Sequence, residues 1–291
     1  MEHTGLYISY LEYEKRYSPH TIAAYRRDLL QFDKFLQENG CPLQEVGFRW
    51  IRRWVVALAS ENNSPRTVNR KIVTLRSFFG YLVKEGVMET NPADKIGSLK
   101  TEKNLPAFIT AGKMDEIPDT NPEDDVFASM RDRMIIEFFY TTGVRLSELI
   151  RLGESDLDLG GMTVKVLGKR NKERIIPLLP EFCRSLGEYL SLKRSRFPDS
   201  GMLFVLNSGQ PLYARWVQRL TDKTLGAVTT QKKRSPHVLR HSFATGMLDN
   251  GADLNAIKEI LGHANLAATQ VYTHNSLKRI KKIYKQAHPR A

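Results

Sequence analysis

The sequence has few cysteines and no long apolar run. Its 291 residues include 2 cysteines, Cys41 and Cys183, which lie far apart without a CxxC partner, so neither a disulfide framework nor a cysteine zinc site is expected. No apolar stretch approaches the roughly 20 residues that a membrane-spanning helix needs. The N-terminus carries acidic residues early and lacks the apolar core of a signal peptide. These absences predict a protein of the reducing cytoplasm without a membrane partner.

Acidic residues are also scarce relative to basic ones. The chain has 44 Lys and Arg against 32 Asp and Glu, which gives a formal net charge of +12 and a pI near 9.6. Such an excess favours a polyanionic partner, nucleic acid above all, because basic side chains replace the counterions of phosphates. A merely basic surface is the alternative. The length is sufficient for two domains.

The first 88 residues predict a bundle of four to five helices. Two segments, which begin at Ser18 and Ser64, share the opening Ser-Pro-x-Thr, and this opening is typical of a helix N-terminus. Apolar residues then recur at helical spacing, and each segment ends in a glycine, Gly40 or Gly86. We expect basic residues on the outer faces of these helices.

The remainder of the chain predicts a linker and a second domain. Residues 89–108 are polar and rich in proline and lack periodicity, as linkers do. In residues 109–291 helical patterns dominate, with a break near Gly143, and two β-rich runs, 163–167 and 174–178, flank a Gly-Lys-Arg-Asn turn. The fold class is therefore mainly α, with a small antiparallel β-sheet in the second domain.

The stretch "SPHVLRHSFAT" places His237, Arg240 and His241 on one face of a predicted helix. A metal site, a phosphate clamp and an ordinary helix surface are the alternatives. A zinc site of the HExxH type needs a glutamate where this chain has Val238, and two-metal chemistry needs carboxylates that the neighbouring stretches lack. No metal is therefore expected.

The phosphate clamp agrees with other residues that suit attack on a phosphodiester. Arginine and histidine stabilise charge on phosphate oxygens, a tyrosine with a pKa near ~10 needs a base to become a nucleophile, and a lysine can protonate the leaving oxygen. The chain offers these groups at separated positions: Arg145, Lys169, His237, Arg240, His263 and Tyr272.

The motifs "TGVRLSEL", "GKRNKERIIPL", "HVLRHSFAT" and "LGHANLAATQVYTH" occur in the order found in the tyrosine recombinases, or phage integrases. The chain resembles this family, and most of all its bacterial chromosomal Xer branch, from Ser18 to the terminal "HPRA". The family's six catalytic positions fall on the six residues above, with Tyr272 as nucleophile and without cofactor. His241 matches no catalytic position and is expected to be a structural histidine with a local hydrogen bond.

The resemblance implies a fold and a reaction. The N-terminal bundle would be a SAM-like core-binding domain, and residues 109–291 a catalytic domain with a C-terminal docking tail. Double-stranded DNA would be cut at a specific site through a 3′-phosphotyrosyl link and rejoined through a Holliday junction. Four protomers would take part, either four copies of this chain or two with a sister recombinase, and a DNA translocase is a further candidate partner.

Three functions remain as alternatives to chromosome dimer resolution at cell division. They are an integrase of a mobile element, a topoisomerase, and a DNA-binding protein without catalysis. Lys169 has Arg170 and Lys172 as competitors for its role. The apolar stripe of the tail, which would otherwise lie exposed, favours docking onto another protomer. Basic residues that flank these motifs form the predicted DNA contacts: Arg66, Arg70, Lys71, Lys172, Arg174 and Arg215.

Overall fold

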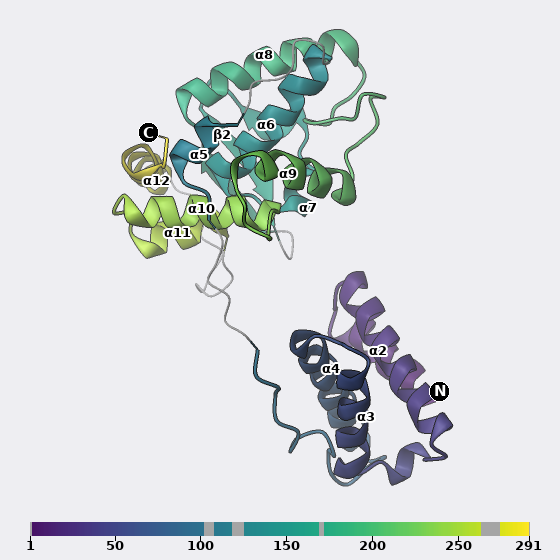
Figure 1. Cartoon of the computed structure of the whole chain (residues 1–291). Coiled ribbons are helices and arrows are strands. Elements are labelled where there is room, and N and C mark those ends of the chain that lie inside the picture. Colours follow the sequence, from purple (N-terminus) through teal and green to yellow (C-terminus); the bar gives the residue numbers. More distant parts are fainter. Residues whose placement is uncertain (1, 102–107, 118–124, 169–171, 263–273, 291) are drawn as a thin grey trace. The chain divides into compact units, whose positions relative to one another are not determined.

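The chain folds into two compact units, Met1–Asn104 and Leu105–Ala291, each with its own hydrophobic core (Figure 1). The structure is a computed structural model that describes residues 2–101, 108–117, 125–168, 172–262 and 274–290. None of the helices in these ranges combines the length and the apolar character needed to cross a bilayer.

The N-terminal unit is a bundle of helices, as the periodicity predicted. Its elements are α1 (Glu2–Ser9), the π-helical η1 (Tyr10–Glu14), α2 (Pro19–Glu38), the 3-10 turn η2 (Leu43–Glu45), α3 (Phe48–Ser60) and α4 (Pro65–Lys84). Both Ser-Pro openings cap helices, since Ser18 Oγ accepts from the Thr21 amide at 3.2 Å and Ser64 Oγ from the Thr67 amide at 3.3 Å. Gly40 and Gly86, just past α2 and α4, have positive φ angles of 63° and 72°.

A buried carboxylate joins α2 to α4. Asp28 is 0% exposed and accepts hydrogen bonds from Arg70 Nη2 at 2.8 Å, Lys71 Nζ at 3.2 Å and Thr74 Oγ1 at 3.0 Å. Lys71 is itself only 6% exposed. The expected outward position of this lysine is therefore wrong, because a buried ionised carboxylate requires charged or hydrogen-bonding partners.

Part of the predicted linker belongs to the core of the N-terminal unit. Ala93 and Ile96 are buried there. The side chain of Asn69 donates to the carbonyl of Leu99 at 2.9 Å and accepts from its amide at 2.7 Å. These contacts fasten residues 91–99 to α4, although the local composition is that of a loop.

The C-terminal unit is mostly helical with one small sheet. Its elements are α5 (Ala111–Asp115), α6 (Val126–Thr142), α7 (Leu146–Leu149), η3 (Glu154–Asp156), β1 (Leu157–Asp158), β2 (Thr163–Leu167), β3 (Glu173–Pro177), α8 (Pro180–Arg196), α9 (Ala214–Val228), α10 (Pro236–Asp249), α11 (Leu254–Leu261) and α12 (His274–Ala287). The sheet is antiparallel in the order β1-β2-β3. The predicted hairpin is confirmed with Thr163 opposite Pro177, whereas β1 was not predicted.

Helix α6 is the central helix of this unit, and α10 packs against it (Figure 1). It ends at Gly143, which has a φ of 60° and donates its amide to the Phe139 carbonyl at 3.0 Å. The predicted break between two helices is thereby confirmed. A β-carbon at Gly143 would lie 2.7 Å from both Leu261 Cδ2 and Phe243 Cδ1, so glycine is required here by conformation and by space.

The C-terminal tail packs on its own unit. Tyr284 and His288 are 2% and 1% exposed. The Tyr284 hydroxyl donates to the Thr141 carbonyl at 2.8 Å, and His288 Nε2 lies 3.1 Å from the same oxygen. The expectation that the apolar stripe would lie exposed without a second protomer is wrong, since its residues Ile280 and Tyr284 belong to the core of the unit and α10, α11 and β3 pack against α12.

Candidate active site

Arg145 follows the glycine break and stands at the N-cap of α7. Its amide donates to Glu148 Oε2 and its Nη1 to Glu148 Oε1, both at 2.7 Å. Its Nη2 donates to the Gly262 carbonyl at 3.2 Å, and the side chain is 34% exposed. A cation at a helix N-terminus opposes the helix dipole, and Glu148 compensates for it.

Arg240 projects from α10 toward the same place. It is 9% exposed and donates to the carbonyls of Gly143, at the end of α6, and of Leu261, at the end of α11, the latter at 2.7 Å. Burial, together with the charges of Arg145 and Arg174, lowers the pKa of Arg240 to about 10. The guanidinium is therefore still charged at neutral pH, and the two helix ends that hold it carry partial negative charge.

Glu148 is the carboxylate on which this arginine cluster is built. It accepts from Arg174 Nη1 at 2.9 Å and Nη2 at 2.7 Å, in addition to its bonds with Arg145. Burial alone would raise the pKa of Glu148, but the hydrogen bonds and charges of Arg174 and Arg145 outweigh it and lower the pKa to about 2. Three guanidinium groups against one carboxylate leave an excess of positive charge, which suits an anionic substrate.

The two histidines of the stretch "SPHVLRHSFAT" differ in exposure. His237, in the first turn of α10, is exposed, and His241 is half-buried. Ser235 occupies the N-cap as predicted but makes no side-chain capping bond. Within the described part of the chain His241 makes no hydrogen bond, so its predicted local bond has no counterpart there. Its neighbour Ser242 instead accepts from the Ile109 amide at 2.7 Å.

Lys169, His263 and Tyr272 lie outside the described residues. The residues on their borders are described. Gly168, which precedes Lys169, donates its amide to the Lys172 carbonyl at 2.8 Å. Gly262, which precedes His263, caps α11 with a φ of 65° and accepts from Arg145. The structure thus brings together Arg145, Arg240 and the glycines that border two further predicted catalytic residues.

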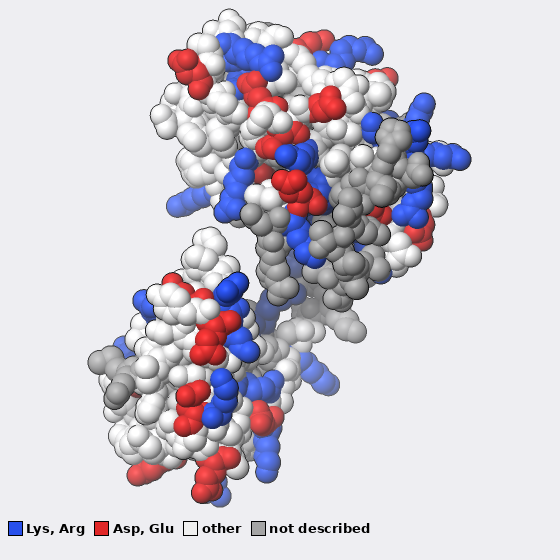
Figure 2. All heavy atoms as spheres, turned by 180° about the vertical axis from the view of Figure 1, so that it is seen from behind, with Lys and Arg blue, Asp and Glu red and all other residues white. Residues whose placement is uncertain are grey.

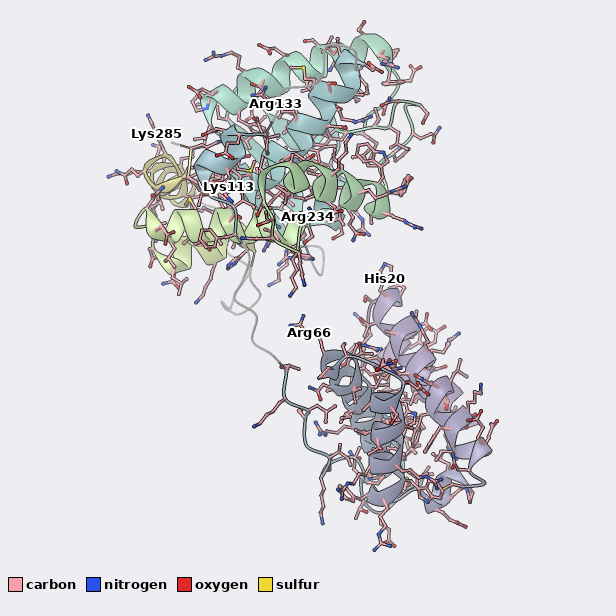
Figure 3. The ribbon with its side chains drawn as sticks, in the orientation of Figure 1. His20, Arg66, Lys113, Arg133, Arg234 and Lys285 are labelled. Carbon is pink, nitrogen blue, oxygen red and sulfur yellow. The ribbon has the colours of Figure 1, made fainter. Side chains whose placement is uncertain are left out.

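The predicted DNA contacts divide into exposed and internal side chains. Arg66, Lys172 and Arg215 are exposed, and Figure 3 shows Arg66 at the opening of α4. Arg70 is exposed but forms an ion pair with Asp28. Two members of the set are buried in ion pairs inside their own units: Lys71 and Arg174. Their internal partners correct the expectation that they would face a ligand.

Some residues near the site were not singled out from the sequence. Glu148 could have been recognised, because a glutamate three residues after a helix start is typical of a capping box. Lys232 and Lys233 are exposed just before the helix that carries His237, and Arg234 at the same corner pairs with Asp222 at 2.9 Å (Figure 3). On the face shown in Figure 2, basic and acidic side chains are interspersed over both units.

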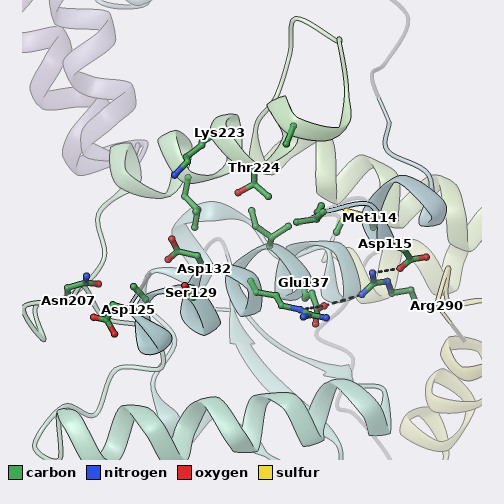
Figure 4. A pocket seen from close by; sticks show the side chains of 16 residues that line it. Met114, Asp115, Asp125, Ser129, Asp132, Glu137, Asn207, Lys223, Thr224 and Arg290 are labelled. Carbon is green, nitrogen blue, oxygen red and sulfur yellow. Dashed lines mark hydrogen bonds and ion pairs between the residues drawn. The ribbon is translucent and has the colours of Figure 1, made fainter. Parts of the chain in front are cut away.

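A pocket of about 600 Å³ lies elsewhere in the C-terminal unit (Figure 4). It is lined from α5, α6, α9 and the tail, where Arg290 donates to Asp115 at 2.6 Å and Glu137 at 3.3 Å. None of the cluster arginines lines it. Among the described residues no three potential metal ligands of the His, Cys, Asp and Glu types lie together.

Comparison with known proteins gives the same assignment over the whole length. The profile of the "Phage integrase family" matches residues 108–279, and that of the "Phage integrase, N-terminal SAM-like domain" matches residues 5–86. The tyrosine recombinase XerC of Pelobacter propionicus is 38% identical over 294 residues, which cover 100% of this chain and 96% of the relative. The XerC of Staphylococcus saprophyticus is 39% identical over 98% of this chain and 96% of its own length.

Solved structures share the fold. A XerH site-specific recombinase bound to a palindromic difH substrate superposes with a TM-score of 0.73 at 24% identity, over 90% of this chain and 78% of that chain. The Tn1549 transposon integrase in complex with circular intermediate DNA gives 0.73 at 20% identity, over 95% and 98%. With its two matched domains and full-length relatives, the chain belongs to the phage integrase family of tyrosine recombinases, enzymes that cleave and rejoin DNA.

Proposed function

We propose that this chain recombines DNA at a specific site with the six residues Arg145, Lys169, His237, Arg240, His263 and Tyr272. The observation that carries the proposal is the convergence of Arg240 and Arg145 on two adjacent carbonyls, those of Leu261 and Gly262. Two charged forks there would stabilise the oxygens of a phosphodiester under attack. The six-residue set is itself part of the proposal, since three of its members lie outside the described residues.

The reaction would run in two transesterifications. The Tyr272 hydroxyl oxygen attacks phosphorus and forms a 3′-phosphotyrosyl bond, while the bond to the 5′ oxygen breaks. His237 accepts the tyrosine proton, and Lys169 donates a proton to the departing 5′ oxygen. A 5′-hydroxyl of the partner strand then attacks the phosphotyrosine and restores tyrosine. One phosphodiester replaces another, so the reaction needs neither nucleotide nor metal.

The biological setting proposed here is the resolution of chromosome dimers at cell division in a bacterial cytoplasm. It is supported by the XerC names of the full-length relatives. We further propose that four protomers hold the two duplexes, as four copies or together with a sister recombinase. The domain boundaries proposed are 1–88 for the DNA-holding bundle, 89–108 for a linker whose residues 91–99 pack on that bundle, and 109–291 for the catalytic domain and tail.

Trapping of the covalent intermediate tests the proposal. Wild type is incubated with nicked duplexes that carry candidate recombination sites, without magnesium or ATP, and SDS-resistant protein–DNA adducts are measured. We expect an adduct that Tyr272→Phe abolishes. Tyr213→Phe is the matched control, because this exposed tyrosine bonds only Arg219 among the described residues, and it should keep the adduct.

The other outcomes separate the alternatives. An equal adduct with Tyr272→Phe would refute Tyr272 as nucleophile. Relaxation of supercoiled DNA without any specific site would favour a topoisomerase. Binding without an adduct on any substrate, alone or with a sister recombinase added, would favour a non-catalytic DNA-binding protein. Recombination confined to the ends of a mobile element would favour an integrase.

A further inference from the structure

Arg174, on β3, is one of the least exposed arginines of the described chain. It is 4% exposed, although the sequence around it resembles a basic hairpin that faces a ligand. Its Nη1 and Nη2 donate to the two oxygens of Glu148 at 2.9 and 2.7 Å. Its Nε donates to the Ile260 carbonyl in the last turn of α11 at 2.8 Å. All three kinds of guanidinium nitrogen are thus engaged within the protein.

The contacts of Arg174 reach three segments that carry or precede candidate catalytic residues. Through Glu148 it is joined to Arg145. A β-carbon built on Gly168, the residue before Lys169, would lie 3.5 Å from Arg174 Nη1, and one on Gly262, the residue before His263, 3.0 Å from its Cδ. The side chain of Arg174 therefore lies between β2, α7 and the end of α11.

We infer that Arg174 is a positioning residue, which fixes the direction of the Arg145 side chain through Glu148 and the place of the α11 end through Ile260. Arg174 touches no reacting atom in this assignment. The inference rests on the proposed function, because it gives Arg145 its catalytic role. It replaces the prediction that Arg174 contacts DNA.

The geometry requires an arginine. A planar fork can bridge both oxygens of one carboxylate and still present Nε to a third acceptor. A lysine carries its charge at one point, so it can neutralise Glu148. It cannot fix the plane of the Glu148 carboxylate and bind the α11 carbonyl at the same time. Misplacement of a catalytic group by about 1 Å can reduce a rate ~100-fold.

The first test separates binding from chemistry. Wild type, Arg174→Lys and Arg174→Gln are compared for the Kd of a recombination-site duplex and for the single-turnover rate of adduct formation at saturating DNA. We expect a Kd within about twofold of wild type and a rate lower by about 100-fold in both variants. If Arg174→Gln does not fold, Arg174→Lys carries the test, since it keeps the charge.

The second test asks whether Arg174 acts through Arg145. Arg145→Lys and the double variant Arg145→Lys/Arg174→Gln are compared in the same rate assay. Residues that act as one unit give non-additive effects, so the double variant should be no slower than Arg145→Lys alone by more than about threefold. If Arg174 had a merely structural role, Arg174→Gln would instead lower the rate by the same factor in the wild-type protein and in Arg145→Lys.

Arg131→Gln is the matched control. Arg131 is also buried, at 3% exposure, and pairs with Asp132 at 2.6 Å, but it has no bond to Glu148 or α11 in the described structure. It should lower thermal stability and leave the rate of the folded enzyme within about twofold.

The failures are distinguishable. No adduct with wild type would count against the proposed function. A wild-type adduct with an unchanged rate in Arg174→Gln would overturn the positioning role alone. A weaker Kd with a normal rate at saturation, and a salt slope reduced by about 1, would identify Arg174 as a phosphate contact instead.

Discussion

At the scale of single residues, one carboxylate holds the candidate site together. Glu148 accepts bonds from two guanidinium groups and from one backbone amide and is 5% exposed. The removal of one partner from a buried ion pair leaves charge without compensation, which costs ~3–5 kcal/mol. The position of the candidate catalytic residue Arg145 and the stability of the unit therefore depend on the same side chain.

Glu148→Gln should remove part of the acid sensitivity of folding. The pKa of Glu148 is about 2 in the folded chain against an ordinary 4.5, so the carboxylate stabilises the fold above pH 4.5 and loses this effect as the pH falls toward 2. That shift corresponds to on the order of 3 kcal/mol. Urea unfolding should show a stability gap between wild type and variant at pH 6 that narrows below pH 4.5.

Glu38→Gln is the control for that series. Glu38 is 60% exposed and, within the described residues, its one ion pair is with Lys34, at 3.6 Å, so the substitution should change stability by less than about 0.5 kcal/mol. A gap for Glu148→Gln that stays constant from pH 6 to pH 3 would contradict the lowered pKa.

Gly143→Ala should be far more costly than the same change at another helix end. Both Gly143 and Gly86 have a positive φ, of 60° and 72°, and an alanine in that conformation costs roughly 1 kcal/mol. Only at Gly143 does the new methyl group meet side chains, at 2.7 Å, and overpacking adds about 1–3 kcal/mol. Thermal unfolding of Gly143→Ala and Gly86→Ala measures the difference, and equal losses would contradict it.

At the scale of elements, the C-terminal ends of two helices, α6 and α11, meet at Arg240 of the arginine cluster. The last carbonyls of α6 and α11 accept from Arg240, and the end of α6 also accepts from the C-terminal tail. These carbonyls have no partner within their own helices. Arginines and the tail satisfy them here, so the site and the tail are fixed by the same helix end.

The tail should loosen in mild acid. His288 Nδ1 accepts from the Arg290 amide at 3.0 Å, so Nε2 carries the proton and donates to the Thr141 carbonyl. Burial, followed by the effect of the nearby Arg290 charge, lowers the pKa of His288 to about 4. A lowered histidine pKa means that the neutral form stabilises the fold above pH ~6.5 and that this effect is lost as the pH falls toward 4.

His288→Gln tests this behaviour, because glutamine cannot titrate. Hydrogen exchange of α12 should show the tail of wild type opening more between pH 7 and pH 5, while the variant changes less after correction for intrinsic exchange rates. His20→Gln, at an exposed histidine of α2, should follow wild type. The same pH response in His288→Gln and wild type would show that another group is responsible.

At the scale of the whole molecule, only part of the 44 Lys and Arg side chains is available to DNA. Lys71 and Arg174 form ion pairs with internal carboxylates, whereas Arg66 and Arg215 are exposed. We expect log Kd for DNA to depend steeply on log salt, as phosphate contacts release counterions.

Single substitutions should distinguish exposed arginines that contact DNA phosphates from exposed arginines that do not. Arg66→Gln and Arg215→Gln should each reduce the salt slope by about 1, as measured by fluorescence anisotropy from low to moderate salt. Arg49→Gln is the control. Residues 61–64 join α3 to α4 and the two helices pack together, so this exposed arginine at the start of α3 lies at the opposite end of the helix pair from Arg66 at the start of α4. A loss of slope with Arg49→Gln would show that the counted contacts are not specific.

Local sequence alone determined the helix openings, the glycine ends, the hairpin and the mainly α fold. Each of these depends on neighbours within a few residues: Ser18 caps α2 by accepting from the Thr21 amide, and α6 ends at Gly143 because a glycine backbone readily adopts the φ of 60° found there. The ordered motifs also determined the family, since six separated patterns rarely agree by chance.

Tertiary structure decided which charges are free. Lys71 meets Asp28 across 43 positions of sequence, and Arg174 meets Glu148 across 26. No local pattern contains such a partner. The sequence around a basic residue in a turn or on a helix face is the same whether water or a buried carboxylate lies beside its side chain. The same holds for the tail, since its apolar stripe is covered by α10 and β3, elements distant in sequence.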